Sequence, residues 1–109
     1  SVPHESINIH MARSIFAGRF RSWPNKQPIK LFVFSDHHEK HELFCKERIG
    51  VFPRQLRRAW DRIMFTGIGE GPTVVNSREE MINWVLKTPG AIGYVIEVDG
   101  VEKYVLPVE

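Results

Sequence analysis

The four residues Ser35-Asp36-His37-His38 could bind a small anion. They follow the apolar segment Ile29 to Phe34, which predicts a strand, and they lead into a predicted helix. Ligands of open α/β sheets lie where strands end and helices begin, and a helix N-terminus offers unpaired N–H groups and a partial positive charge. Ser35, Asp36, His37 and His38 are therefore our candidate anion-binding residues. The alternative is that Ser35 or Asp36 only caps the helix.

The densest cluster of potential metal ligands overlaps this turn and consists of His37, His38, His41, Glu39 and Glu42. His37 and His41 are four residues apart and would share one face of a helix, a spacing that can chelate zinc, nickel or copper. The segment is not an HExxH motif, because Glu42 stands where its second histidine belongs, and no third ligand is evident. We expect a solvated, pH-sensitive helix face here and no resident metal or cofactor.

A basic face is predicted on the helix that begins at Pro53, where Arg54, Arg58 and Arg62 fall opposite the apolar stripe. Nucleic-acid binding would require exposed aromatic residues beside such a face, but Trp60 falls on the apolar side and Asp61 interrupts the charge. We therefore expect no nucleic-acid partner. The alternatives are a solvated face and docking to an acidic protein, with Arg54, Arg58 and Arg62 as candidate partner-binding residues.

Nothing in the sequence indicates an enzyme. The chain has no Gly-x-Ser-x-Gly elbow, and its one cysteine, Cys45, is predicted to be a buried thiol on an apolar helix face. The glycine-rich segment Gly67 to Pro72 lacks the lysine and Ser/Thr of a phosphate-binding P-loop and leads into a strand, so it predicts a connecting loop.

Length and composition indicate one domain spanning residues 1–109. The chain is 42% hydrophobic and carries a formal net charge of +2, which tolerates anions without strongly attracting them. It is too short for two lobes that would clamp a ligand. No apolar run could cross a bilayer, and the opening Ser-Val-Pro-His-Glu-Ser does not resemble a signal peptide.

Periodicity predicts an α/β fold with a mixed sheet flanked by helices and a C-terminal β-hairpin. Ser77 and Glu80 predict a capping box, and Gly93 would let a backbone or ligand approach its strand closely. The predicted elements are a helix from Ser6 to Gly18, a strand Ile29 to Phe34, a helix Asp36 to Arg48 with Leu43, Phe44 and Ile49 inward, a helix from Pro53 with Leu56, Ala59, Trp60, Ile63 and Met64 inward, a strand Thr73 to Asn76, a helix from Ser77 with Met81, Trp84 and Val85 inward, and two strands joined by a tight turn at Val98 to Val101.

An ordered set of short segments resembles the phosphate-type substrate-binding proteins of bacterial ABC importers, which are type II periplasmic binding proteins, and in particular their small single-lobe relatives. The likeness runs from about Ser6 to Tyr94. Its segments are Ile15-Phe16-Ala17-Gly18-Arg19, Trp23-Pro24, Phe52-Pro53-Arg54-Gln55-Leu56 with Trp60, Phe65-Thr66-Gly67, Gly71-Pro72 and Thr88-Pro89-Gly90-Ala91-Ile92-Gly93-Tyr94.

The resemblance implies a single periplasmic-binding-protein-like lobe that binds phosphate or another small oxyanion and works in the periplasm or as an exported protein. In the family, the turn after the strand typically carries an arginine followed by Ser-Gly-Thr, whereas here only Ser35 offers a hydroxyl. The alternative is a degenerate lobe that lost its small ligand and acts as a protein–protein interaction module, with a protein partner or a second copy.

Overall fold

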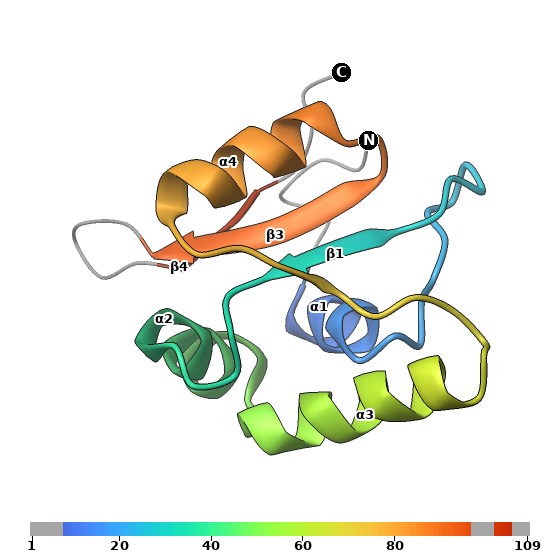
Figure 1. The fold of residues 1–109 in the computed structure, drawn as a ribbon, viewed down its shortest axis with the longest axis horizontal. Coiled ribbons are helices and arrows are strands. Elements are labelled where there is room, and N and C mark those ends of the chain that lie inside the picture. The colour runs from blue at the N-terminus through green and yellow to red at the C-terminus, as the bar shows by residue number, and fades with distance from the viewer. Residues whose placement is uncertain (1–7, 97–101, 106–109) are drawn as a thin grey trace.

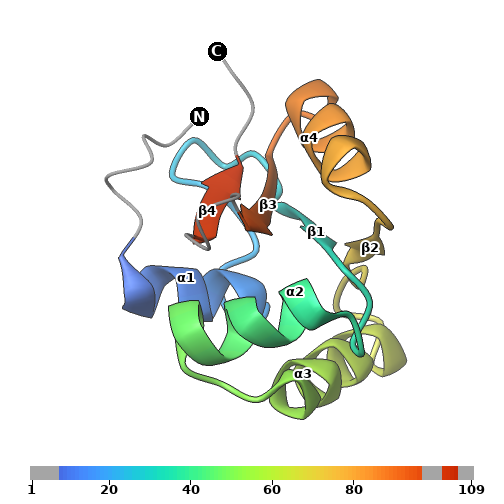
Figure 2. The same cartoon turned by 90° about the vertical axis from the view of Figure 1, so that its left-hand side faces the viewer.

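A four-stranded mixed sheet with helices on both faces forms the fold (Figure 1). The computed structural model describes residues 8–96 and 102–105. Helix α4 covers one face of the sheet, and α1, α2 and α3 cover the other (Figure 2). The elements in chain order are α1 (Ile9–Phe16), β1 (Lys30–Val33), α2 (Glu39–Leu43), a π-helix η2 (Phe44–Ile49), α3 (Pro53–Phe65), β2 (Thr73–Val74), α4 (Arg78–Lys87), β3 (Ala91–Ile96) and β4 (Glu102–Val105).

The sheet has the strand order β2-β1-β3-β4. Strand β1 runs parallel to both of its neighbours, β2 and β3, whereas β3 and β4 are antiparallel. The predicted mixed sheet, its flanking helices and the final antiparallel pair are thus confirmed. The predicted turn at Val98 to Val101 lies outside the described residues. Among the described residues, no helix has the length and apolar character needed to cross a membrane.

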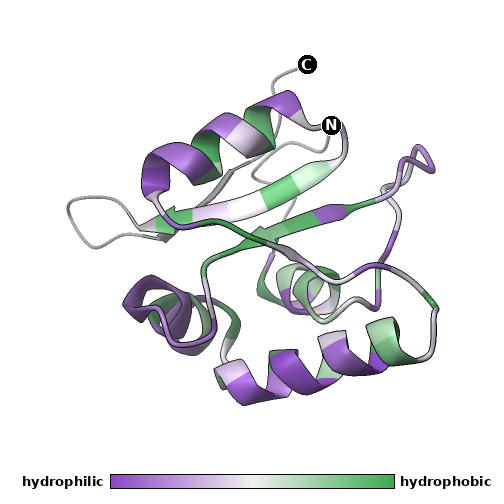
Figure 3. Ribbon diagram, in the orientation of Figure 1, coloured by the Kyte–Doolittle hydropathy of each residue, from purple (hydrophilic) through white to green (hydrophobic). Residues whose placement is uncertain are grey.

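The core lies between β1, β3 and the helices on both faces, and β1 is mostly coloured as hydrophobic in Figure 3. Helix α1 begins after Asn8, whose side chain accepts the Met11 N–H at 2.8 Å. The cap is therefore Asn8, two residues later than the predicted Ser6. On α3, Trp60 is buried, and its indole Nε1 donates to the Phe16 carbonyl at 2.7 Å, which ties α3 to the end of α1.

The segment after β1 differs from the predicted helix Asp36 to Arg48. Residues 35–38 form a turn closed by the His38 N–H bond to the Ser35 carbonyl, and α2 begins only at Glu39 with His38 as its N-cap. The helix then widens into η2, whose five-residue hydrogen-bonding period turns Phe44 and Ile49 inward. Leu43, predicted to point inward, is 38% exposed because the buried face of this segment runs through His41, Phe44 and Cys45.

Helix α4 packs tightly on β3. The Ser77 hydroxyl accepts the Glu80 N–H at 3.0 Å, which confirms the predicted N-terminal cap. A Cβ atom on Gly93 would overlap Met81 and Val85 of α4, so the predicted close approach at this glycine is made by helix side chains.

Two predicted apolar stripes are narrower than expected. On α4, Met81 and Val85 are buried, but Trp84 is 51% exposed. On α3, Leu56 and Trp60 are buried, whereas Met64 lies near the solvent-exposed C-terminal end of the helix and is itself exposed. Each helix therefore has two fully buried residues one turn apart. The sheet covers only part of the predicted apolar face of α4, and α1 covers only part of that of α3.

Candidate functional site

An open groove of about 490 Å³ lies at the carboxyl end of β1, between the turn that follows β1, the α2–η2 segment and the start of α3. Its position is typical of a ligand site. The chain leaves β1 toward β2 through α2 and α3 on one face, then crosses to β3 through α4 on the other, so this end of β1 is a topological switch point. The lining residues are Asp36, His37, Glu42, Lys46, Phe52, Pro53, Arg54 and Arg57.

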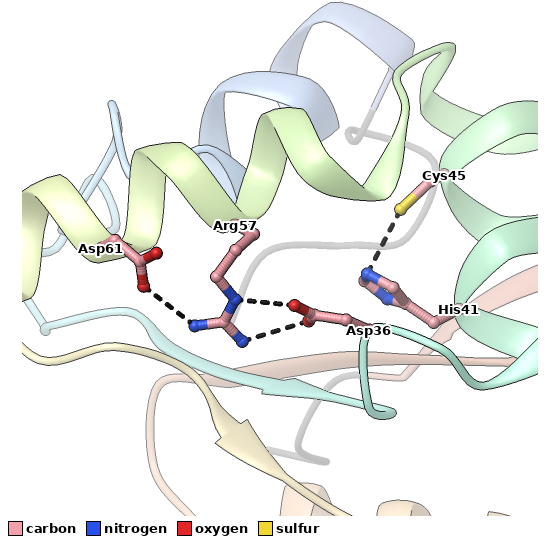
Figure 4. Close-up of polar contacts among 5 residues, drawn as sticks. All are labelled: Asp36, His41, Cys45, Arg57 and Asp61. Atoms are coloured by element: carbon pink, nitrogen blue, oxygen red, sulfur yellow. Dashed lines mark hydrogen bonds and ion pairs between the residues drawn. The ribbon is translucent and has the colours of Figure 1, made fainter.

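Asp36 is held by Arg57 across this groove (Figure 4). The guanidinium donates two hydrogen bonds to the carboxylate, Nε to Oδ2 at 2.7 Å and Nη2 to Oδ1 at 3.1 Å, and Nη1 reaches Asp61 at 3.2 Å. The bonds from Arg57 lower the pKa of Asp36 below its ordinary value, although partial burial opposes the shift. The same bonds raise the pKa of Arg57. Asp36 is therefore ionised, and the positive charge of Arg57 balances its negative charge.

The other three predicted anion-binding residues are spread over the turn. Ser35 is exposed and does not line the groove. His38 caps α2, because its Nδ1 accepts the Lys40 N–H at 3.1 Å, and its ring stacks on Phe34 with centroids 4.8 Å apart. His37 is exposed and lines the groove. Of the four predicted residues, only Asp36 and His37 thus face the cavity.

Two exposed cations complete the groove and were not assigned to an anion site from the sequence. Lys46 comes from η2, and Arg54 is the second residue of α3, where its guanidinium lies 4.8 Å from the centre of the Phe52 ring. Arg54 was predicted to bind a protein partner, together with Arg58 and Arg62, which are exposed farther along α3 and do not line the groove. Because η2 and α3 are consecutive elements, Lys46 and Arg54 are only eight positions apart in the sequence.

His41 lies in the core next to the groove and is fully buried. The Tyr94 hydroxyl accepts the Phe34 N–H at 3.1 Å and lies 2.5 Å from His41 Nδ1, while His41 Nε2 lies 3.5 Å from Cys45 Sγ. The Tyr94 oxygen already accepts the Phe34 N–H, so its own proton needs an acceptor. We therefore assign His41 Nδ1 as that acceptor and place the proton of the neutral ring on Nε2, toward the sulfur. This chain of bonds links β1, β3 and the α2–η2 segment.

Burial sets the protonation of these three groups. It lowers the pKa of His41, so the imidazole is neutral at pH 7. It raises the pKa of Cys45 to about 12 and raises the pKa of Tyr94, so both remain protonated. The Cys45 thiol is fully buried, as predicted.

His37 and His41, the weak metal-ligand candidates, do not share one face of a helix. His37 precedes α2 and faces solvent, whereas both ring nitrogens of His41 are engaged inside the core. The prediction of a solvated face was therefore wrong for His41. Among residues 8–96 and 102–105, no group of three or more His, Cys, Asp or Glu residues is arranged to hold a metal ion.

Comparisons with protein-family models, with curated proteins and with solved structures find no match to this chain. The resemblance to phosphate-binding importer proteins therefore stays a prediction from the sequence.

Proposed function

We propose that this domain binds a small oxyanion, with phosphate as the first candidate, in the groove at the carboxyl end of β1. The observation that carries the proposal is the meeting of Lys46, Arg54 and the N-terminus of α3 in one cavity. A helix N-terminus adds about half a positive charge to the side-chain cations around it. The lobe-like fold and the exported location that the resemblance implies belong to the same proposal.

The charge balance of the groove supports an anion. Lys46, Arg54 and Arg57 oppose the carboxylates of Asp36 and Glu42, so the lining has a net charge of +1 with its histidine neutral. Arg57 neutralises Asp36, and no ion pair engages Lys46 or Arg54 within the part of the chain that the structure describes. Lys46 and Arg54 are therefore the cations that can turn toward a ligand.

This arrangement replaces the family's hydroxyl-rich turn with side-chain charge. The Ser35 turn has no helix N-terminus of its own, since α2 begins four residues later, and it provides one hydroxyl outside the groove. The anion is recognised mainly by charge in an open groove, so binding should be weaker and more salt-dependent than recognition by a closed ring of hydrogen bonds.

Calorimetric titration with phosphate, with sulfate in parallel, tests the proposal. Saturable binding is expected to weaken at least tenfold when Lys46→Gln and Arg54→Gln are combined. Arg58→Gln, an equal loss of charge on α3 outside the groove, should change the affinity less than twofold. Absence of saturable heat up to about 10 mM anion, a limit near 3 kcal/mol of binding free energy, would reject the proposal. It would favour the interaction module, for which charge reversal at Arg58 should break a complex.

A further inference from the structure

A second cavity, of about 440 Å³, lies at the opposite end of β1 from the groove. It is bordered by the C-terminal half of α3, the loop that leads from α3 to β2, and the segment between α1 and β1. Its volume equals that of about 15 liquid water molecules and falls in the range typical of small-molecule sites. It shares no residue with the groove, so an inference about it is independent of the proposed oxyanion site.

Apolar and polar surface share the walls of this cavity about equally. Trp60 and Phe32 are buried and form part of its lining, and Ile63 is half-buried beside them. Phe20 and Ile68, both at least half exposed, also line it. Figure 3 colours the last turn of α3 as hydrophobic, in contrast with the hydrophilic turns before it. A ligand could therefore bury an apolar body against aromatic and branched side chains.

Two glycines and one hydrogen bond fix the walls. A Cβ atom on Gly18 would overlap Ile63, and one on Gly71 would overlap Met64, so both backbone segments pack directly against α3. Arg21 Nη1 donates to the Ile68 carbonyl at 3.3 Å, which joins the segment after α1 to the loop after α3. The segments that border the cavity are thus held against one another.

The polar lining has one excess positive charge. Arg21 and Lys30 contribute two cations and Glu70 one carboxylate, and within the described ranges none of the three forms an ion pair. A single carboxylate on a ligand would balance this charge. A dianion such as phosphate would instead leave one uncompensated negative charge beside Glu70. The planar guanidinium of Arg21 also matches the two oxygens of a carboxylate.

We propose that this cavity is a binding site for a small monocarboxylate with an apolar body, its carboxylate at Arg21 and Lys30 and its body against Trp60. The three tryptophans provide a built-in test, because Trp60 lines the cavity while Trp23 and Trp84 do not. Protein labelled with ¹⁵N is titrated with 3-phenylpropionate, and the three indole N–H signals are followed by NMR. The neutral amide of this acid, 3-phenylpropionamide, serves as the matched probe.

The expected result is a saturable shift of the Trp60 signal, with a dissociation constant of about 1 mM or tighter for a ligand of this size, and an unchanged Trp84 signal. The amide should bind at least tenfold more weakly. Equal affinities for acid and amide would overturn the carboxylate assignment, and an unshifted Trp60 signal would overturn the site.

Two variants separate the cavity from general changes in fold. Gly69→Leu adds a side chain at a backbone position outside the left-handed region, where the first added atom meets Ile63 at an ordinary 3.5 Å. The leucine side chain should fill the cavity and reduce the ligand-induced shift of the Trp60 indole signal at least tenfold. Arg21→Gln should weaken binding at least threefold, while Arg19→Gln, an exposed charge outside the cavity, should not. Equal effects of Arg19→Gln and Arg21→Gln would contradict the proposal.

Discussion

Arg57 donates two parallel hydrogen bonds to the carboxylate of Asp36, so the acidic residue of the predicted anion-binding turn is already paired with a cation from α3. The pair connects the end of β1 to the helix whose N-terminus faces the same groove. In the oxyanion site that we propose, Asp36 would therefore position the groove without contacting the ligand, and Arg57 would prevent its charge from repelling the anion.

Removing Arg57 should expose the negative charge of Asp36 to the anion. We expect Arg57→Gln to weaken phosphate binding about tenfold and to lower the free energy of unfolding by no more than about 1 kcal/mol, because the pair is partly exposed and screened by solvent. Calorimetry and urea unfolding measure the two effects. Adding Asp36→Asn to Arg57→Gln should restore most of the affinity. If the double variant binds as weakly as Arg57→Gln, Arg57 contacts the ligand directly.

The same pair predicts an acid-dependent loss of stability. Because the folded-state pKa of Asp36 lies below its ordinary value of 3.8, the pair contributes stability above that value, and the contribution disappears as pH falls through the lowered pKa. Urea unfolding of the native chain and of Asp36→Asn should therefore differ most above pH 4 and converge toward pH 2. Curves separated by a constant amount over this range would show that Asp36 titrates normally.

His41 predicts a second pH effect, close to neutrality. Burial lowers the pKa of His41 in the folded chain below the ordinary 6.5 of the unfolded chain. At a pH between the folded and unfolded pKa values, the unfolded chain therefore binds a proton at His41 that the folded chain does not bind. Its contribution to stability is complete above pH 6.5 and is lost as pH falls toward the lowered pKa. Unfolding measured between pH 7.5 and 5 should show this decline, and His41→Gln should reduce the slope. An equal slope in the variant would assign the effect to other groups.

Tyr94 satisfies two buried partners with one hydroxyl, the Phe34 N–H and His41 Nδ1. Tyr94→Phe keeps the ring stacked on Phe44 but leaves both partners without a bond, and we expect a loss of about 2 to 3 kcal/mol in the free energy of unfolding. Urea unfolding at pH 7.5 measures it. A loss below about 0.5 kcal/mol would mean that water or a rearranged His41 replaces the hydroxyl.

Local sequence signals predicted most of the elements and the mixed sheet. Ser77 with Glu80 located the start of α4, and Pro53 located the start of α3, because caps and N-terminal prolines act within one turn of chain. The start of α2 was misplaced by three residues. Ser35 and Asp36 are good capping residues, but Asp36 is engaged by Arg57, which is 21 positions away in the sequence. No local pattern reveals such a pairing.

The candidate groove was predictable only in part. The rule that ligands lie beyond the carboxyl ends of strands located the turn after β1, and His37 and Asp36 do line the groove there. Lys46 and Arg54 are near each other in the sequence, but only the fold places them beside the turn after β1. His41 was assigned to a solvated helix face because polar residues surround it in the sequence, whereas here Tyr94 provides the buried partner that makes its burial possible.

Gly93 should not accept even one methyl group without a loss of stability. The Cβ atom of Gly93→Ala would overlap the Met81 sulfur and press on Val85, and although the methionine can move, the valine is stiff. We expect a loss of about 1 to 3 kcal/mol in the free energy of unfolding. Gly69→Ala is the matched control, since its Cβ meets only an ordinary contact, and it should change stability by less than about 0.5 kcal/mol. If both changes lower the free energy of unfolding equally, then the close approach of α4 to β3 does not require glycine at position 93.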